Sequence, residues 1–248
     1  MSRVMAVIAA AAFVLAAGCS NGGGGRRQVT VFAAASLSDA FKAMTKPFSD
    51  AHDHDSLTFN FAGSQQLVAQ LQQGAKADAL ATADQPTMAS VPVKDRSDSP
   101  AVFARNRLVI AVGRGNPKHV QTLADLARGD LKVVLAAPAV PAGKYARQAL
   151  AKAGVNLSPV SLEDNVEAVV TKVGLGEADA GIVYVTDAKA GRNVDAVQIP
   201  DVDNVVAAYP AVGLRLGSQR AGGEQFVDFL RSPSGQAILR RFGFLPPK

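Results

Sequence analysis

The sequence predicts an α/β fold in which mostly parallel sheets are flanked by helices. Short apolar runs rich in β-branched residues alternate along the chain with segments whose apolar positions recur at helical spacing. Of the 248 residues, 48% are hydrophobic and 19% are charged, which is typical of a globular protein and excludes a disordered or fibrous chain. The length allows one large domain or two lobes, each with its own core.

The first residues have the pattern of a bacterial lipoprotein signal. A basic start at Arg3 precedes an apolar run at 4–15, which is shorter than the roughly 20 residues needed to span a bilayer. Ala-Ala-Gly-Cys at 16–19 resembles a lipoprotein box, and Cys19 is the only cysteine of the chain. We predict a signal peptide at 1–18, a lipid on Cys19 with a flexible tether at 19–28, and anchoring at the outer face of the cell membrane. The alternative is an ordinary cleaved signal that leaves Cys19 free.

The next elements predicted are strand, helix, strand and helix. The run at 29–34 is mostly apolar and rich in β-branched residues, which indicates a buried strand. A helix follows it, with Ser36 predicted as the N-cap and Asp39 near the capping-box position. A second strand at 57–61 ends at Gly63-Ser64, and a helix at 65–73 is closed by Gly74.

The rest of the chain continues the same alternation. Further strands are predicted at 79–82, 108–112, 132–136, 180–185 and 205–214. Further helices are predicted at 143–153, 166–172, 224–230 and 234–242, with a short one beginning at Thr122.

Two of the strand-to-helix turns share one chemistry. Ser36 and Ser64 each lie where an apolar strand ends and an amphipathic helix begins, among small neighbours. The first N–H groups of a helix have no partner inside it and carry partial positive charge, and a serine adds a hydroxyl donor. These turns therefore suit an anion, either at two sites or at one site shared by both helix ends. Each serine could instead simply cap its helix.

Several motifs, in order along the chain, resemble the periplasmic molybdate-binding proteins of ABC transporters. They are VFAAASL at 31–37, FAGSQQL at 61–67, ADALATAD at 77–84, VPAGKYA at 140–146, GIVY at 181–184 and RFGF at 241–244. The resemblance implies a two-lobed type II periplasmic-binding-protein fold with the ligand in the cleft between the lobes. It also implies that the chain is a binding protein rather than an enzyme, and that it delivers molybdate, and also tungstate, to an ABC importer.

The resemblance also implies a set of ligand-binding residues. Ser36 and Ser64 would bind the oxyanion from the first lobe through backbone N–H and hydroxyl groups. Ala142 and Val166 would each supply a backbone N–H from the second lobe, and Tyr184 its phenolic hydroxyl. The first lobe is expected at 29–106 plus 210–248 and the second at 107–209, with hinge strands near 103–112 and 205–213. Lobe closure around the ligand and docking on a membrane permease would follow.

The proposed contacts are all neutral donors, and this bears on which anion binds. Molybdate, tungstate and sulfate are fully deprotonated dianions near neutral pH and accept every hydrogen bond. Phosphate keeps a proton that would need a carboxylate acceptor, and no Asp or Glu is among the five positions. Sulfate therefore stays open as an alternative ligand, because cavity size separates it from molybdate. A secreted serine hydrolase is a further alternative, although the sequence has no Gly-x-Ser-x-Gly elbow. So is a lipoprotein with a purely structural role.

Composition excludes several other classes of site. One cysteine and three histidines leave no basis for a direct protein–metal site or an iron–sulfur cluster, and no cofactor is expected. The net charge of +5 is spread along the chain, so no nucleic-acid partner is predicted. We expect a monomer. Lys144 and Arg147 are expected at the surface, not as ligands, because several helix N-termini together can hold a dianion.

Overall fold

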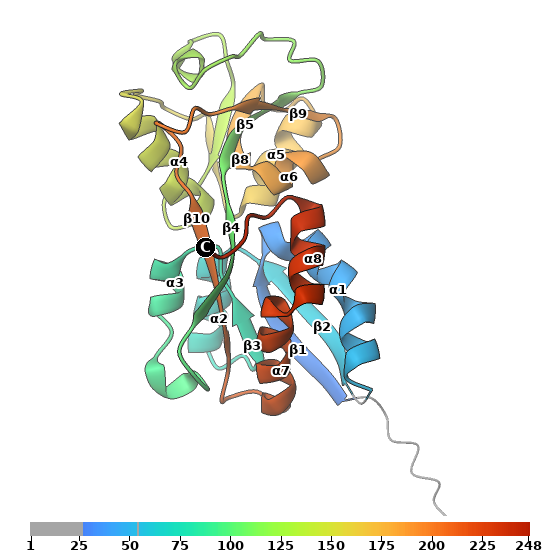
Figure 1. Ribbon diagram of the computed structural model, residues 1–248. Coiled ribbons are helices and arrows are strands. Elements are labelled where there is room, and N and C mark those ends of the chain that lie inside the picture. Colours follow the sequence, from blue (N-terminus) through green and yellow to red (C-terminus); the bar gives the residue numbers. More distant parts are fainter. Residues whose placement is uncertain (1–26, 54) are drawn as a thin grey trace, which may run out of the picture.

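The computed structural model describes residues 27–53 and 55–248, which fold into two α/β lobes (Figure 1). The predicted signal, Cys19 and most of the tether lie outside these residues. Each lobe has its own five-stranded sheet, with strand order β2-β1-β3-β10-β4 in the first lobe and β7-β6-β8-β5-β9 in the second. Within the described ranges, no helix is long and apolar enough to cross a membrane.

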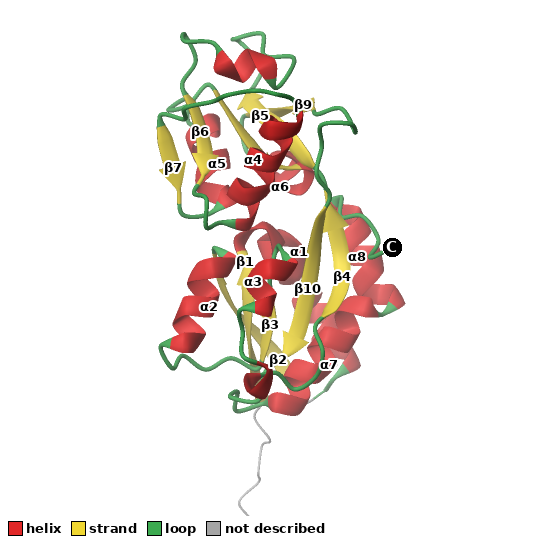
Figure 2. Ribbon diagram, turned by 90° about the vertical axis from the view of Figure 1, so that its left-hand side faces the viewer, coloured by secondary structure: helices red, strands yellow, loops and turns green. Residues whose placement is uncertain are grey.

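The first lobe is built from both ends of the described chain. Its strands are β1 (Arg27–Ala34), β2 (Asp55–Ala62), β3 (Ala79–Ala81), β4 (Ala101–Asn106) and β10 (Ala207–Gly213). Its helices are α1 (Ser38–Ala51), α2 (Ser64–Gln72), α3 (Gln85–Ala89), α7 (Arg220–Arg231) and α8 (Pro233–Phe242), with 3-10 turns at Ala35–Leu37 and Val93–Asp95. The terminal helices α7 and α8 return to this lobe and pack beside α1 (Figures 1 and 2).

The second lobe is continuous in sequence. Its strands are β5 (Leu108–Gly113), β6 (Val133–Ala136), β7 (Ser161–Glu163), β8 (Ala180–Tyr184) and β9 (Val194–Gln198). Its helices are α4 (Pro141–Lys152), α5 (Val166–Gly174) and α6 (Val185–Ala190), with a 3-10 turn at Ala124–Ala127 where a short helix from Thr122 was predicted. β7 and β9 were not predicted, because both are short and neither has a long apolar run.

The sheets are mixed. The pairs β1–β2, β1–β3, β6–β7 and β6–β8 are parallel, as strand–helix alternation predicts. The strands that follow each crossing between lobes, β5 and β10, pair antiparallel with both of their neighbours. Parallel pairing places the carboxyl ends of β1, β2 and β3 at one edge of the first sheet, which is where the helix-opening turns meet the other lobe.

The chain crosses between the lobes twice, and a buried asparagine marks each crossing. Asn106 ends β4, and its Nδ2 donates to Thr186 Oγ1 at 2.8 Å. Asn204 lies between β9 and β10, and its Oδ1 accepts from the N–H of Leu108 at 3.1 Å. β10 pairs with β4 from Ala207 onward, so the second crossing lies earlier than the boundary predicted at 210. Figure 2 shows β4 and β10 side by side, with the end of β4 and the start of β10 toward the second lobe.

The turn after β1 differs from its prediction. Ser36 is not the N-cap of α1, because the chain first makes a 3-10 turn at Ala35–Leu37 and α1 begins at Ser38. Leu37 occupies the N-cap position and makes no side-chain hydrogen bond there. Because Ser36 does not cap α1, its hydroxyl is available to another partner. Phe41 packs below this turn against Phe103 and Phe226, and these rings anchor α1 to the sheet.

Candidate functional site

The two lobes enclose a small cavity where their helix-opening turns face one another. It is lined by Ala34, Ala35, Ser36, Ala62, Gly63, Ser64, Ala83, Val140, Pro141, Ala142, Asn165, Val166 and Tyr184. All five positions predicted for ligand binding therefore lie around one cavity, two from the first lobe and three from the second.

The cavity collects the starts of several helices. Ser64 and Val166 are the first residues of α2 and α5, Ala142 is the second residue of α4, and Ser36 lies in the 3-10 turn that leads into α1. Backbone N–H groups in a first helical turn have no acceptor inside the helix, and the helix dipole gives them partial positive charge. The N-termini of α2, α4 and α5 and the 3-10 turn before α1 thus surround one cavity. Together they make it electropositive without a charged side chain on its wall.

The serine hydroxyls are held by partners that leave a donor available. The backbone N–H of Ala83 donates to Ser64 Oγ at 3.1 Å, so the Ser64 proton is free to be donated onward. Ser36 Oγ lies 3.1 Å from the hydroxyl oxygen of Tyr209 on β10. When Tyr209 donates in this contact, Ser36 also keeps a proton for a ligand.

Tyr184 brings a buried hydroxyl donor to the cavity. Its hydroxyl is buried at the cavity wall and has no hydrogen-bond partner among the described residues. Burial is the main cause that raises the pKa of Tyr184 well above its ordinary value, and the neighbouring Tyr209 is the next. The hydroxyl therefore keeps its proton, and remains a donor, at physiological pH. An unpaired buried hydroxyl costs stability, and a ligand oxygen would satisfy it.

No carboxylate lines the cavity within the part of the chain that the structure describes. The one side-chain amide, that of Asn165, is occupied, since its Oδ1 accepts from the N–H of Ala168 at 3.0 Å. The wall thus offers donors to an anion and, among the described residues, no carboxylate to accept an anion's own proton. This donor set fits a fully deprotonated oxyanion better than one that carries a proton.

The serine hydrolase alternative finds no support in this geometry. No histidine of the described ranges lies on the cavity wall. The hydroxyls of Ser36 and Ser64 contact Tyr209 and a backbone N–H, neither of which can act as a general base here.

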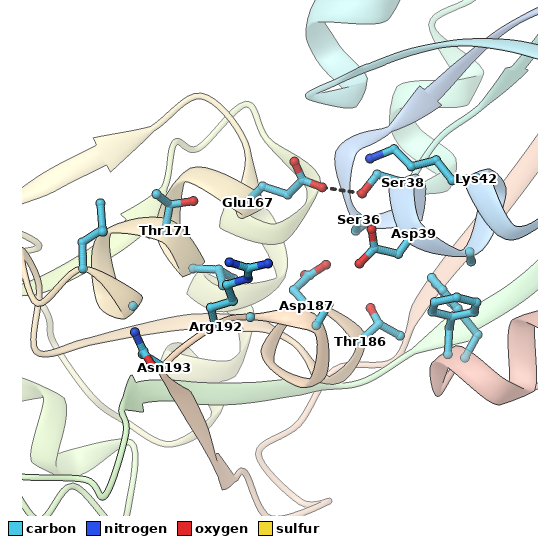
Figure 3. Close-up of a pocket in the computed structure, with 18 residues that line it drawn as sticks. Ser36, Ser38, Asp39, Lys42, Glu167, Thr171, Thr186, Asp187, Arg192 and Asn193 are labelled. Carbon is cyan, nitrogen blue, oxygen red and sulfur yellow. Dashed lines mark hydrogen bonds between the residues drawn. The ribbon is translucent and has the colours of Figure 1, made fainter.

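Hydrogen bonds from the side chains of Ser38, Gln65 and Lys144 join the lobes around the cavity. Ser38 Oγ donates to Glu167 Oε1 at 2.6 Å, a contact drawn as a dashed line in Figure 3. Gln65 Nε2 donates to the carbonyl of Asp164 at 2.9 Å. Lys144 Nζ lies 2.8 Å from Asp84 Oδ2. The lobes are therefore in a closed arrangement.

The two cations expected at the surface have different positions. Neither Lys144 nor Arg147 lines the cavity. Arg147 Nη1 donates to the carbonyls of Ala136 and Gly143, both in its own lobe. Lys144 instead reaches across to the first lobe, and its side chain is 33% exposed.

A larger opening lies beside the small cavity, between α1 of the first lobe and α5 and α6 of the second (Figure 3). The two spaces share Ser36. Asp187 lines this opening, and its Oδ2 accepts from the N–H of Tyr184 at 3.1 Å. Burial raises the pKa of Asp187 to about 8, and the charges of Glu167 and Asp39 add to this effect. A neutral Asp187 places no negative charge behind Tyr184.

Comparison with known proteins places the chain in a family. Residues 29–245 match the family described as bacterial extracellular solute-binding protein. The molybdate-binding protein ModA of Mycobacterium tuberculosis is 41% identical over 221 residues, covering 88% of this chain and 85% of that protein. ModA of Escherichia coli is 32% identical over 229 residues and covers 88% of each chain.

The fold is shared with a solved structure from the same group. The periplasmic molybdate-binding protein of Azotobacter vinelandii superposes with a TM-score of 0.76 at 19% identity, covering 89% of this chain and all of that one, which shows the fold alone. Sequence and fold thus agree: this chain belongs to the bacterial extracellular solute-binding proteins, in the branch that includes the ModA proteins.

Proposed function

We propose that this chain captures molybdate, and also tungstate, in the cavity between its lobes. The observation that carries the proposal is the donor set: four helix starts and the unpartnered hydroxyl of Tyr184 surround one cavity whose described wall holds no carboxylate. The names of its relatives, molybdate-binding proteins at up to 41% identity, support the same ligand. Sulfate is the second candidate, because the same donors suit any tetrahedral dianion.

Isothermal titration calorimetry with molybdate, tungstate, sulfate and phosphate, on the chain from residue 21 onward, tests this proposal. We expect tight binding of molybdate and tungstate, weak binding of sulfate and no binding of phosphate. Replacing Ser36 and Ser64 together by alanine removes two hydrogen bonds to a charged ligand, and we expect at least a hundredfold loss, or about 3 kcal/mol. Unchanged molybdate affinity in this double variant would overturn the site assignment.

We further propose that the closed, loaded protein docks on the permease of an ABC importer while a lipid on Cys19 holds it at the outer face of the cell membrane. The sequence pattern at 16–19 and the membership in the solute-binding family support this arrangement. Mass spectrometry of the protein from the membrane fraction should find a diacylglyceryl group on Cys19. The Cys19→Ser variant should leave the membrane fraction, and retention there without lipid would contradict the anchor.

A further inference from the structure

One ion pair crosses between the lobes, and its geometry gives it a function in closure. Lys144 lies in the first turn of α4, in the second lobe. Its Nζ lies 2.8 Å from Asp84 Oδ2 and 3.0 Å from Thr87 Oγ1, both in the first lobe. Among the ion pairs of residues 27–53 and 55–248, the Lys144–Asp84 pair is the one that joins the two lobes. Each of the others lies within a single lobe.

The two partners differ sharply in burial. The Asp84 side chain is 1% exposed, while that of Lys144 is 33% exposed. Asp84 is also the N-cap of α3, because its Oδ1 accepts from the N–H of Thr87 at 2.9 Å. In the closed form, therefore, Lys144 is the cation that compensates a carboxylate largely removed from water. Opening the lobes would separate the pair and let water reach Asp84.

Both ends of this ion pair are tied to the anion cavity. Lys144 lies two positions after Ala142, a proposed ligand donor, in the same helical turn. Asp84 follows Ala83, whose N–H holds the Ser64 hydroxyl in place. A shift of either partner would move a donor group at the cavity wall. The pair is thus formed in the geometry in which the donors of the two lobes meet.

We propose that Lys144 is a closure latch: a positioning residue that binds Asp84 and Thr87 only when the lobes are closed, and so slows release of the bound anion. This inference rests on the proposed oxyanion function. It assigns Lys144 no contact with the anion. Its effect belongs to the dissociation rate, because the latch forms after the ligand has entered and must break before the ligand leaves.

The test compares Lys144→Gln with Lys172→Gln. Lys172 is a matched control, because its Nζ pairs with Glu163 at 2.7 Å inside the second lobe and its side chain is also 33% exposed. Stopped-flow measurements should give molybdate dissociation at least about tenfold faster in Lys144→Gln, because the closed form would then hold an uncompensated carboxylate. Association should stay within about twofold, and Lys172→Gln should match the wild type in both rates.

A second variant separates a latch from a merely stabilising contact. Asp84→Asn keeps a capping side chain on α3 but removes the charge that Lys144 compensates. If the penalty in Lys144→Gln comes from the buried Asp84 charge, the double variant should release molybdate more slowly than Lys144→Gln alone. Lys144→Arg should restore most of the wild-type rate.

The outcomes are distinguishable. Equal dissociation rates in Lys144→Gln and Lys172→Gln, with tight binding by the wild type, would overturn the latch alone. No rescue by Asp84→Asn would overturn it as well, because the buried charge would then not be the cause. A wild-type chain that binds neither molybdate nor tungstate would overturn the proposed function, and the latch's part in anion release with it.

Discussion

At the scale of single residues, the proposed anion site consists of neutral groups, and neighbouring residues fix the orientation of its two serines. Ser64 is oriented by the N–H of Ala83, and Ser36 by Tyr209. Tyr184 differs from both, because its hydroxyl has no protein partner in the described structure. The two serines are therefore oriented before a ligand binds, whereas Tyr184 would gain its first hydrogen bond from the proposed ligand.

This difference predicts opposite effects of Tyr184→Phe on binding and on stability. Loss of the hydroxyl should weaken molybdate binding by about tenfold or more, since a hydrogen bond to a charged group is worth about 1.5–3 kcal/mol. The ligand-free variant should unfold at the same temperature or higher, because an unsatisfied buried group has been removed. Calorimetry and thermal unfolding check the two effects. Lower stability of the ligand-free variant would show that the hydroxyl already has a partner there.

Residues close in sequence to a motif could be predicted, and residues that act through distant contacts could not. The five donor positions follow from a resemblance carried by short motifs, and all five line the cavity. Tyr209 was missed because its partner Ser36 is 173 positions away. The contact of Lys144 with Asp84 was missed because nothing local to Lys144 shows that Asp84, 60 positions earlier, lies across the cleft.

At the scale of elements, the site depends on helices that start close to the ends of strands. α4 approaches β6 so closely that a Cβ on Gly143 would lie 2.1 Å from the carbonyl oxygen of Ala137 and 2.3 Å from that of Ala136. Both contacts are with backbone, which cannot rotate away as a side chain can. Glycine at this position therefore allows the start of α4, with Ala142, to reach the cavity.

Gly143→Ala should shift the start of α4 and reduce both stability and affinity. We expect a loss of about 1–3 kcal/mol in the free energy of unfolding, as for other overpacked sites, and weaker molybdate binding because Ala142 moves. Gly129→Ala is the control, since a Cβ there meets nothing within 4 Å. Urea unfolding and calorimetry measure the two quantities. Equal values for the two variants would contradict the close approach of α4 to β6.

Elements with strong apolar patterns were predicted well, and those without them were missed or displaced. The predicted strand at 108–112 lies within β5, and the helix at 166–172 within α5. β7 and β9 were missed because both are short strands at a sheet edge, and neither Ser161–Glu163 nor Val194–Gln198 has a long apolar run. The 3-10 turn after β1 was read as the start of a helix, because Ser36 and Asp39 have the spacing of a cap.

At the scale of the whole molecule, neither lobe has a complete site. The first lobe supplies Ser36 and Ser64, and the second supplies Ala142, Val166 and Tyr184. A ligand that contacts both sets stabilises the closed arrangement over any open one by its differential affinity. The hydrogen bonds Ser38–Glu167 and Gln65–Asp164 add to this preference, since they also join the lobes.

The interface between the lobes also carries a carboxyl group that should make stability depend on pH. Asp187 on α6 is buried, and burial raises its pKa from 3.8 to about 8, with a smaller contribution from Glu167 on α5 and Asp39 on α1. Between these two values the folded chain binds one more proton at this site than the unfolded chain. The free energy of unfolding should therefore fall as pH rises from about 4 to about 8, because the unfolded carboxyl ionises more readily.

The variant Asp187→Asn isolates this effect from all other titrating groups. Asparagine can still accept the N–H of Tyr184 through its amide oxygen, but it does not titrate. Urea unfolding from pH 5 to 9 gives the free energy of unfolding of each protein. The value for the wild type minus that for the variant should fall steadily up to about pH 8 and then level off. A difference that does not change with pH would mean that Asp187 ionises at the same pH in the folded and unfolded chains. Burial between the lobes would then not keep it neutral.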